Sequence, residues 1–189
     1  MTRRAWFGIA VGFLVALLGV SSPARAQNGK RTTVILVRHA EKAVEPAADP
    51  PLTEAGKARA EALWMALKDA GVRAVITTQY ARTVATGAPT ASRLGITPEV
   101  VNAGGANHPA QVASLVKTKH AGETVLVVGH SNTVPAIIAA LGAKEPPAIC
   151  DEVYDNFYVV TIDEAGNASL IHSRYGAATP PSASCGSMK

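Results

Sequence analysis

The amino-acid sequence predicts a three-layer α/β/α sandwich with a mostly parallel central sheet, and it allows an antiparallel strand at the sheet edge. Two runs, Val34–Val37 and Val125–Val128, contain only Val, Ile and Leu. Short runs of this kind are typical of strands that are buried on both faces, as in parallel sheets. Strand-like and helix-like patterns then alternate from residue 32 to residue 141, which is the order expected of an α/β domain.

The expected elements follow one another with short connections. Thr53 is an N-cap for the first helix and Gly71 ends it, and the acidic turn at 163–167 indicates a hairpin between the last two strands. Residues 95–109 are expected to be mainly loop. Strands are expected at Thr32–Val37, Ala74–Thr77, Thr124–Val128, Phe157–Ile162 and Ala168–His172, and helices at 54–69, Ala81–Leu94, Pro109–Lys119 and Thr133–Leu141.

The first 26 residues have the features of a secretory signal peptide. Arg3 and Arg4 precede an uncharged apolar segment, Trp6–Val20, and Ala24-Arg25-Ala26 is a small-x-small cleavage site. The apolar segment is short for a membrane span, which needs roughly 20 residues, so no stable membrane insertion is expected after cleavage. We therefore expect residues 27–189 to form a single domain in the periplasm or outside the cell.

Cleavage changes the charge of the protein. The 189-residue chain has 18 basic and 14 acidic residues, and loss of Arg3, Arg4 and Arg25 leaves 15 basic ones, a net charge near +1. A nearly neutral chain does not indicate the basic surface that nucleic-acid-binding proteins have, so nucleic acid is not an expected partner. The two cysteines, Cys150 and Cys185, can form a disulfide outside the cytosol.

Side chains that favour phosphate follow three of the predicted strands. Arg38 and His39 follow the first, Arg82 begins the helix after the second, and His130 and Ser131 follow the third. Ligands of open parallel sheets bind beyond the carboxyl ends of the strands, so these side chains are expected to converge. Arginine binds phosphate oxygens through a planar fork of donors, and the helix start at Ser131 offers backbone N–H groups. The sequence therefore predicts a phosphate site.

These residues resemble the motifs of the histidine phosphatase superfamily, the phosphoglycerate-mutase-like proteins. The family's Arg-His pair, Arg-Thr-x-x-Thr segment and later Gly-His pair occur here as Arg38-His39, Arg82-Thr83-Val84-Ala85-Thr86 and Gly129-His130. Leu52-Thr53-Glu54-Ala55-Gly56 fits the family's Leu-Thr-x-x-Gly helix start. The resemblance covers nearly all of residues 27–189, and the ordered set is far more specific than any one motif.

The resemblance implies catalysis through a phosphohistidine, without a metal or another cofactor. His39 would attack phosphorus in line with the leaving oxygen, and water would later release the phosphoryl group. Arg38, Arg82 and His130 would form the phosphate pocket, with Ser131 at its edge. A metal site is the alternative because Glu41 lies near His39, but zinc normally needs three protein ligands and the arginines would repel a cation.

The sequence offers more than one candidate for the group that would protonate the leaving group. Many family members carry an acid directly after the second histidine or in the segment after the second arginine. Here Ser131 follows His130, and residues 102–108 contain no carboxylate. The candidates are His108 and three acids of a later loop, Asp151, Glu152 and Asp155. As histidines outside the motifs, His108, His120 and His172 are otherwise expected at the surface or in loops.

Three functions are consistent with these features. The first is an exported, metal-independent phosphatase that acts on a small or lipid-linked phosphomonoester. The second is the same chemistry on phosphohistidine or on a phosphoprotein, and the imidazole that leaves from phosphohistidine needs less protonation than an alkoxide. The third is a non-catalytic periplasmic module that binds phosphate without turning it over.

Overall fold

The computed structural model describes residues 30–179 and residue 185, so the predicted signal peptide lies outside the described part of the chain. A six-stranded sheet with the order β3-β2-β4-β1-β5-β6 forms the middle layer. The strands are β1 (Thr32–Arg38), β2 (Val72–Thr77), β3 (Glu99–Val100), β4 (Thr124–Gly129), β5 (Asn156–Ile162) and β6 (Ala168–Arg174). The helices are α1 (Glu54–Leu67), α2 (Ala81–Leu94), α3 (His108–Lys119) and α4 (Thr133–Ala140).

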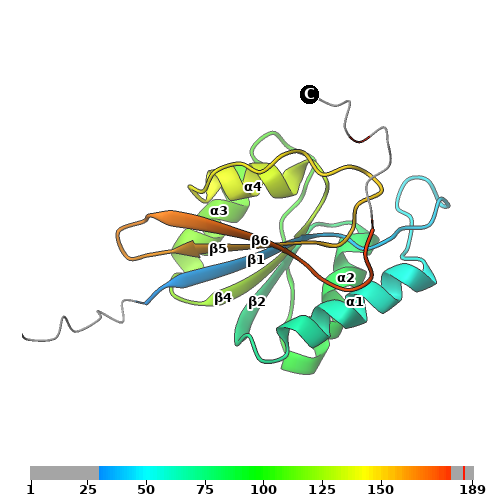
Figure 1. The fold of residues 1–189 in the computed structure, drawn as a ribbon, viewed down its shortest axis with the longest axis horizontal. Coiled ribbons are helices and arrows are strands. Elements are labelled where there is room, and N and C mark those ends of the chain that lie inside the picture. The colour runs from blue at the N-terminus through cyan, green and yellow to red at the C-terminus, as the bar shows by residue number, and fades with distance from the viewer. Residues whose placement is uncertain (1–29, 180–184, 186–189) are drawn as a thin grey trace, which may run out of the picture.

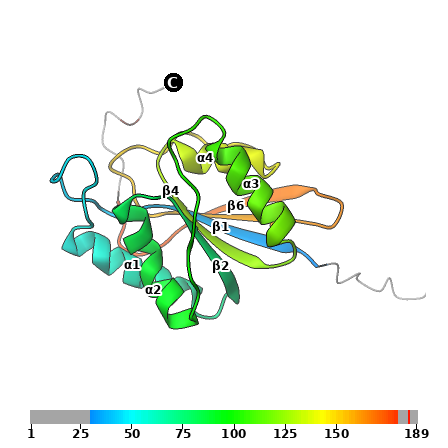
Figure 2. The same cartoon turned by 180° about the vertical axis from the view of Figure 1, so that it is seen from behind.

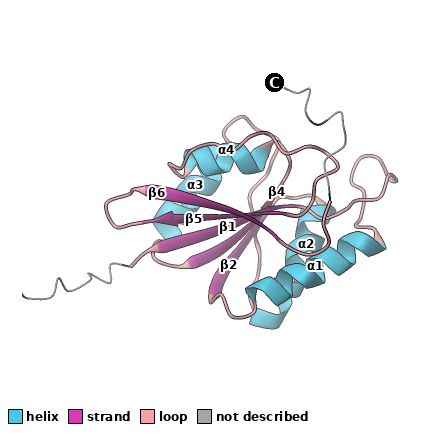
Figure 3. Ribbon diagram, in the orientation of Figure 1, coloured by secondary structure: helices cyan, strands magenta, loops and turns pink. Residues whose placement is uncertain are grey.

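Two helices cover each face of the sheet. Helices α1 and α2 pack together on one side and α3 and α4 on the other, and the view from behind shows the same three layers (Figures 1 and 2). Strands β1 to β4 run parallel, whereas β5 runs antiparallel to β1 and β6 antiparallel to β5. The predicted α/β/α sandwich with a mostly parallel core is therefore confirmed, and the antiparallel edge is the β5–β6 hairpin (Figure 3).

Alternating side chains of the central strands explain why their sequences are apolar throughout. In β1, Val34 and Leu36 belong to the core under α3 and α4, whereas Ile35 and Val37 belong to the core under α1 and α2. Strand β4 repeats this arrangement. Both strands lie in the middle of the sheet with helices above and below, so every position in the run is buried.

The predicted element boundaries hold to within two residues at most positions. Thr53 caps α1 by accepting the N–H of Gly56 at 3.1 Å. A side chain at Gly56 would clash with the carbonyl oxygen of Glu41, which explains the glycine of the Leu-Thr-x-x-Gly motif. The segment 95–109 is mainly loop, as expected, apart from the short strand β3 and the first residues of α3, which begins at His108. Among the described residues, no helix is long and apolar enough to cross a membrane.

The strand order brings three loops together at one edge of the sheet. The chain runs from β1 to β2 and β3 and then returns to place β4 between β1 and β2. The carboxyl ends of β1, β2 and β4 are therefore neighbours, although they are far apart in sequence. This edge is where a ligand site is expected in an open α/β sheet.

Candidate active site

The predicted phosphate-binding side chains converge on one cavity at that edge. Its volume is about 320 Å³. Arg38 and His39 reach it from the end of β1, Arg82 from the start of α2, and His130 and Ser131 from the end of β4. The two imidazole rings lie with their centroids 5.3 Å apart. The remaining lining residues are Lys42, Tyr80, Ala103, Asn132, Thr133 and Asp151.

His39 is held as a neutral imidazole with one free nitrogen. Its Nδ1 lies 2.8 Å from the carbonyl oxygen of Ala40, so Nδ1 carries the hydrogen and Nε2 keeps its lone pair. The side chain is buried, and burial lowers its pKa to about 3, with further lowering by the positive charge of Arg38. An unprotonated Nε2 at neutral pH is the state that a nucleophile requires.

His130 is also neutral in the unliganded protein. Burial, and then the charge of Arg82, lower its pKa to about 4. Its Nε2 lies 3.1 Å from the Thr78 hydroxyl, which is held in turn by Thr83 at 2.9 Å. A phosphate dianion in the cavity would favour the protonated imidazole, because an opposite charge nearby stabilises the charged form.

The glycine before His130 is required by close packing. A Cβ atom at Gly129 would lie 2.9 Å from Oγ1 of Thr133 and 3.0 Å from a methyl carbon of Val134. The same Thr133 hydroxyl accepts the backbone N–H of His130 at 2.9 Å. The Gly-His pair therefore brings the end of β4 into direct contact with the first turn of α4.

Arg38 is fixed by the loop that follows α4. Its Nη1 donates to the carbonyl oxygens of Cys150 at 2.8 Å, Asp151 at 2.7 Å and Val153 at 3.3 Å. The Tyr154 ring lies over the guanidinium, with 4.4 Å between the Arg38 Cζ atom and the ring centroid. Because most of these partners are neutral dipoles, they orient the guanidinium without cancelling its charge.

Arg82 has a closely similar environment. Its guanidinium lies over the Tyr80 ring, 4.3 Å from Cζ to the centroid, and its Nη1 is 3.5 Å from a carboxylate oxygen of Asp49. The Nε atoms of Arg38 and Arg82 are both buried and have no acceptor among the residues that the structure describes. Both arginines thus retain donors that a bound oxyanion could satisfy.

The first turn of α4 adds backbone donors to the cavity. Asn132 is the N-cap residue, but its side chain makes no capping hydrogen bond. Ser131, Asn132 and Thr133 all line the cavity. An uncapped helix start beside two arginines and two imidazoles suits an anion.

Of the four candidates for a general acid, Asp151 is the one that lines the cavity. His108 is buried rather than at the surface, its Nδ1 contacts the Asn102 carbonyl at 3.1 Å, and its Nε2 has no partner. Glu152 is exposed and does not line the cavity. The carboxylate at the rim is Asp151, which accepts the Ser131 hydroxyl at 3.2 Å. Asp155 is bound to Arg174 and Thr179, away from the cavity.

His120 lies in the loop between α3 and β4, which agrees with the expected surface or loop position, although the side chain is not exposed. The ring is buried between Glu99 at 2.8 Å and Glu123 at 2.9 Å. This arrangement links β3 to the turn before β4. His172 is exposed, as expected, and contacts Asn156.

Glu41 is engaged in a structural ion pair and is not directed at His39. The Arg59 side chain binds its carboxylate through Nε at 2.9 Å and Nη2 at 2.8 Å, and also donates to the carbonyl oxygens of Tyr175 and Ala177. Among the described residues, no three His, Cys, Asp or Glu side chains are grouped so that they could hold a metal ion.

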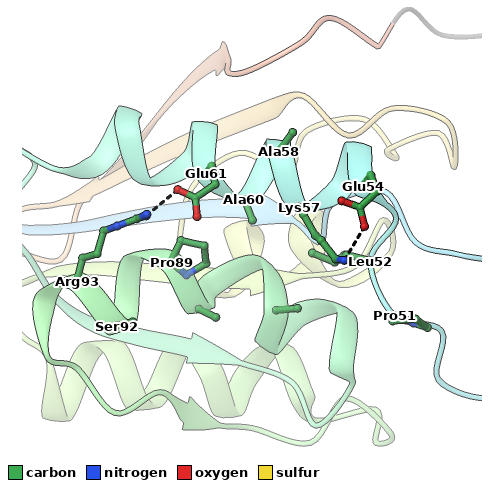
Figure 4. Close-up of a pocket in the computed structure, with 12 residues that line it drawn as sticks. Pro51, Leu52, Glu54, Lys57, Ala58, Ala60, Glu61, Pro89, Ser92 and Arg93 are labelled. Atoms are coloured by element: carbon green, nitrogen blue, oxygen red, sulfur yellow. Dashed lines mark hydrogen bonds and ion pairs between the residues drawn. The ribbon is translucent and has the colours of Figure 1, made fainter.

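A larger hollow, about 770 Å³, lies between α1 and α2 and is not part of this site. Figure 4 shows small apolar residues between the helices and two ion pairs, Glu54–Lys57 and Glu61–Arg93. It contains no histidine and neither arginine of the phosphate cavity. The smaller, polar cavity therefore remains the candidate active site.

Several contacts in the site were not predicted from the sequence. They are the tyrosines over the two arginines, the Thr78 hydroxyl on His130, and the Asp49 carboxylate on Arg82. The position of Thr78, directly after β2 and near Arg82, is the sequence signal that could have indicated one of them.

Comparison with known proteins finds similarity to the histidine phosphatase superfamily. The sequence profile of the histidine phosphatase superfamily (branch 1) matches residues 34–103. A candidate phosphohistidine phosphatase SixA from Nakamurella multipartitia has a similar structure, with 28% identity, 78% of this chain and 98% of that chain covered, and a TM-score of 0.55. The protein histidine phosphatase SixA complexed with tungstate is 21% identical, with 75% and 96% covered and a TM-score of 0.57.

A more distant structural relative has a different substrate in its name. A mycobacterial glucosyl-3-phosphoglycerate phosphatase is 15% identical, with 78% of this chain and all 100% of that chain covered, and a TM-score of 0.58. No curated protein matches the sequence.

Proposed function

We propose that this chain is a member of the histidine phosphatase superfamily and hydrolyses a phosphomonoester through a phosphohistidine at His39. One observation carries the proposal: a neutral His39 lies in a small cavity between two arginines whose donors are not all used. A cavity for phosphate binding alone would not need an imidazole with a free Nε2.

The reaction has two steps. Nε2 of His39 attacks phosphorus, the bond from phosphorus to the leaving oxygen breaks, and that oxygen takes up a proton. A water molecule then attacks phosphorus, the phosphorus–nitrogen bond breaks, and orthophosphate and neutral His39 are formed. The Ala40 carbonyl stabilises the positive charge that the ring acquires while Nε2 is phosphorylated, because it accepts the Nδ1 hydrogen.

The site supplies charge through side chains. Arg38 and Arg82 face the equatorial oxygens of the transferring phosphoryl group, and His130 becomes a further donor when the dianion raises its pKa. These groups stabilise the negative charge of the transferring phosphoryl group, as a bound divalent cation would. This supports a metal-independent reaction.

A phosphorylated imidazole is a second candidate substrate, supported by two observations. The cavity contains no carboxylic acid other than Asp151, and Asp151 is already engaged by Arg38 and Ser131. A leaving imidazole needs less protonation than an alkoxide. Two structural relatives are SixA proteins, one of them 28% identical.

We also propose that the protein is exported. The sequence of residues 1–26 supports this, and so does the Cys150–Cys185 disulfide, since such bonds persist mainly in oxidising compartments. N-terminal sequencing of the protein from cell fractions tests the proposal: a mature chain that begins at Gln27 outside the cytoplasm is expected, and one that begins at Met1 in the cytoplasm would contradict it.

The activity is tested with the purified mature protein and p-nitrophenyl phosphate, with a phosphorylated histidine peptide as the second substrate. Replacement of His39 by Gln should abolish hydrolysis of both. His172→Gln is the matched control, because this exposed histidine lies on β6 and does not line the cavity. Full activity of the His39→Gln variant would refute the nucleophile, and tight orthophosphate binding without any hydrolysis would favour the non-catalytic module.

A further inference from the structure

The disulfide and the phosphate site meet at one arginine. The Cys150 sulfur is bonded to Cys185, with the two Cα atoms 5.7 Å apart, while the Cys150 carbonyl oxygen accepts from Nη1 of Arg38 at 2.8 Å. Asp151 and Val153 supply the other two carbonyl contacts of that nitrogen. All three acceptors lie 112 to 115 residues beyond Arg38 in the chain.

The loop that carries these carbonyls contains little regular structure. Residues 141–155 between α4 and β5 contain no helix or strand, and within the loop Val153 N–H donates to the Cys150 carbonyl at 3.0 Å. A loop without a ladder of backbone hydrogen bonds depends on its other attachments for a fixed conformation. The attachment nearest to the Arg38 contacts is the disulfide itself.

A further attachment lies several residues further along, in addition to the Ser131–Asp151 contact and the burial of Ile149 and Val153 in the core. The Thr179 hydroxyl accepts the backbone N–H groups of Tyr154 at 2.9 Å and Asp155 at 3.2 Å. This contact holds the loop beside Tyr154, whose ring covers Arg38. Thr179 and Cys185 thus hold the two ends of the segment that surrounds the guanidinium, and only the cysteine pair is covalent.

We propose that the Cys150–Cys185 disulfide is a positioning element for Arg38. Breaking the disulfide then lowers the affinity of the site for phosphate and leaves the fold in place. The carbonyls hold Nη1 and thereby fix the orientation of the guanidinium, which lines the cavity. Without the covalent tie, the carbonyl oxygens no longer hold fixed places, and the arginine loses its preorganised orientation. The inference rests on the proposed function only for its activity readout.

Orthophosphate binding is the direct test. In the mature Cys150→Ser/Cys185→Ser variant, calorimetry should show orthophosphate bound about ten-fold more weakly than in the wild type. With p-nitrophenyl phosphate, KM should rise more than kcat falls. Reduction of the wild type by dithiothreitol is the second route: two electrons and two protons pass to the disulfide, two thiols form, and dithiothreitol becomes its cyclic disulfide. The same loss of affinity is expected.

A double-mutant cycle distinguishes a loss of Arg38 orientation from a general loosening of the protein around the site. In an Arg38→Lys background, loss of the disulfide should have little further effect on orthophosphate affinity, because lysine cannot keep the fork that the loop orients. In the matched Arg82→Lys background the full ten-fold effect should remain. Equal effects in both backgrounds would overturn the proposal.

The outcomes also distinguish this inference from the proposed function. Unchanged affinity in the serine variant and in the reduced wild type would overturn the positioning role and leave phosphatase activity intact. A wild-type protein that neither binds orthophosphate nor hydrolyses a phosphoester would overturn both. If the serine variant does not fold, the reduced wild type and its two lysine variants give the same comparison.

Discussion

The hydroxyl oxygen of Thr86 accepts the backbone N–H of Ala40 at 2.9 Å, and the same hydroxyl donates to the carbonyl oxygen of Arg82 at 2.7 Å. One side chain therefore joins the turn that carries His39 to the helix that carries Arg82. Residues four apart lie on the same face of a helix, which explains the spacing of the Arg-Thr-x-x-Thr segment.

Replacement of Thr86 by Val should destabilise the protein and impair the site. Ala40 is fully buried, so its N–H would lose its only acceptor, at a cost of about 1–3 kcal/mol in the free energy of unfolding. Hydrolysis should fall as well, since the tie between His39 and Arg82 is lost. Urea denaturation and steady-state kinetics measure the two effects.

Thr90 offers a matched control on the same helix. It is also fully buried, but its hydroxyl has no hydrogen-bond partner. Thr90→Val should therefore be neutral or stabilising, because a buried hydroxyl without a partner is itself unfavourable. Similar losses of stability in the two variants would show that the Thr86–Ala40 hydrogen bond makes no particular contribution to the free energy of unfolding.

Stability should fall as the solution is acidified. The pKa values of buried His39 and His130 are lowered from 6.5 to about 3 and about 4, so the unfolded chain binds more protons below about pH 6.5. As the pH falls, each histidine then lowers the free energy of unfolding by about 1.4 kcal/mol per pH unit, until the pH reaches the pKa of that histidine in the folded protein. Urea denaturation between about pH 7 and about pH 5 should show this slope.

The double variant His39→Gln/His130→Gln isolates the two histidines, because glutamine does not titrate. Its stability should change less between neutral and mildly acidic solution than that of the wild type. Parallel pH profiles for the two proteins would contradict the neutral, buried state of these imidazoles. Saturating orthophosphate should reduce the wild-type slope, since the bound anion stabilises protonated His130.

Asp49 has two roles that different substitutions can separate. Its carboxylate accepts the N–H of Ala81 at the start of α2, at 3.0 and 3.1 Å, and it lies 3.5 Å from Nη1 of Arg82. Asp49→Asn keeps an acceptor for Ala81 but removes the negative charge beside the phosphate site. Orthophosphate should then bind about two- to five-fold more tightly, a modest gain because the carboxylate is partly exposed.

Asp49→Ala is the comparison that removes the helix cap as well. This variant should lose about 1 kcal/mol in the free energy of unfolding, whereas the asparagine variant should lose little. Weaker orthophosphate binding in Asp49→Asn would show that the carboxylate helps to orient Arg82 rather than competing with phosphate for it.

The fold was largely predictable because the local pattern of apolar residues indicates which positions are buried. The runs Val34–Val37 and Val125–Val128 indicated buried strands, and Thr53 marked the start of the first helix, which ends at Leu67, before the predicted stop at Gly71. Strand β3 has only two residues, which are too few to carry a periodic pattern. The convergence of Arg38, His39, Arg82 and His130 followed from their positions after parallel strands.

The parts of the site that sequence could not provide depend on backbone atoms and distant partners. The three carbonyl oxygens that hold Arg38 have no signature in residue type, and they come from a loop more than 110 residues away. The burial of His120 depends on Glu99 and Glu123, which only the folded chain brings to both ring nitrogens. Long-range polar contacts of this kind are specified by topology rather than by local pattern.

The most direct measurement of the central claim is rapid acid or alkali quench of the mature protein during turnover, followed by mass spectrometry of its peptides. A transient phosphoryl group that is labile in acid and stable in alkali should be found on the peptide containing His39, and it should be absent from the His39→Gln variant. A phosphoryl group on another residue, or turnover with no phosphoenzyme at any time point, would contradict the mechanism.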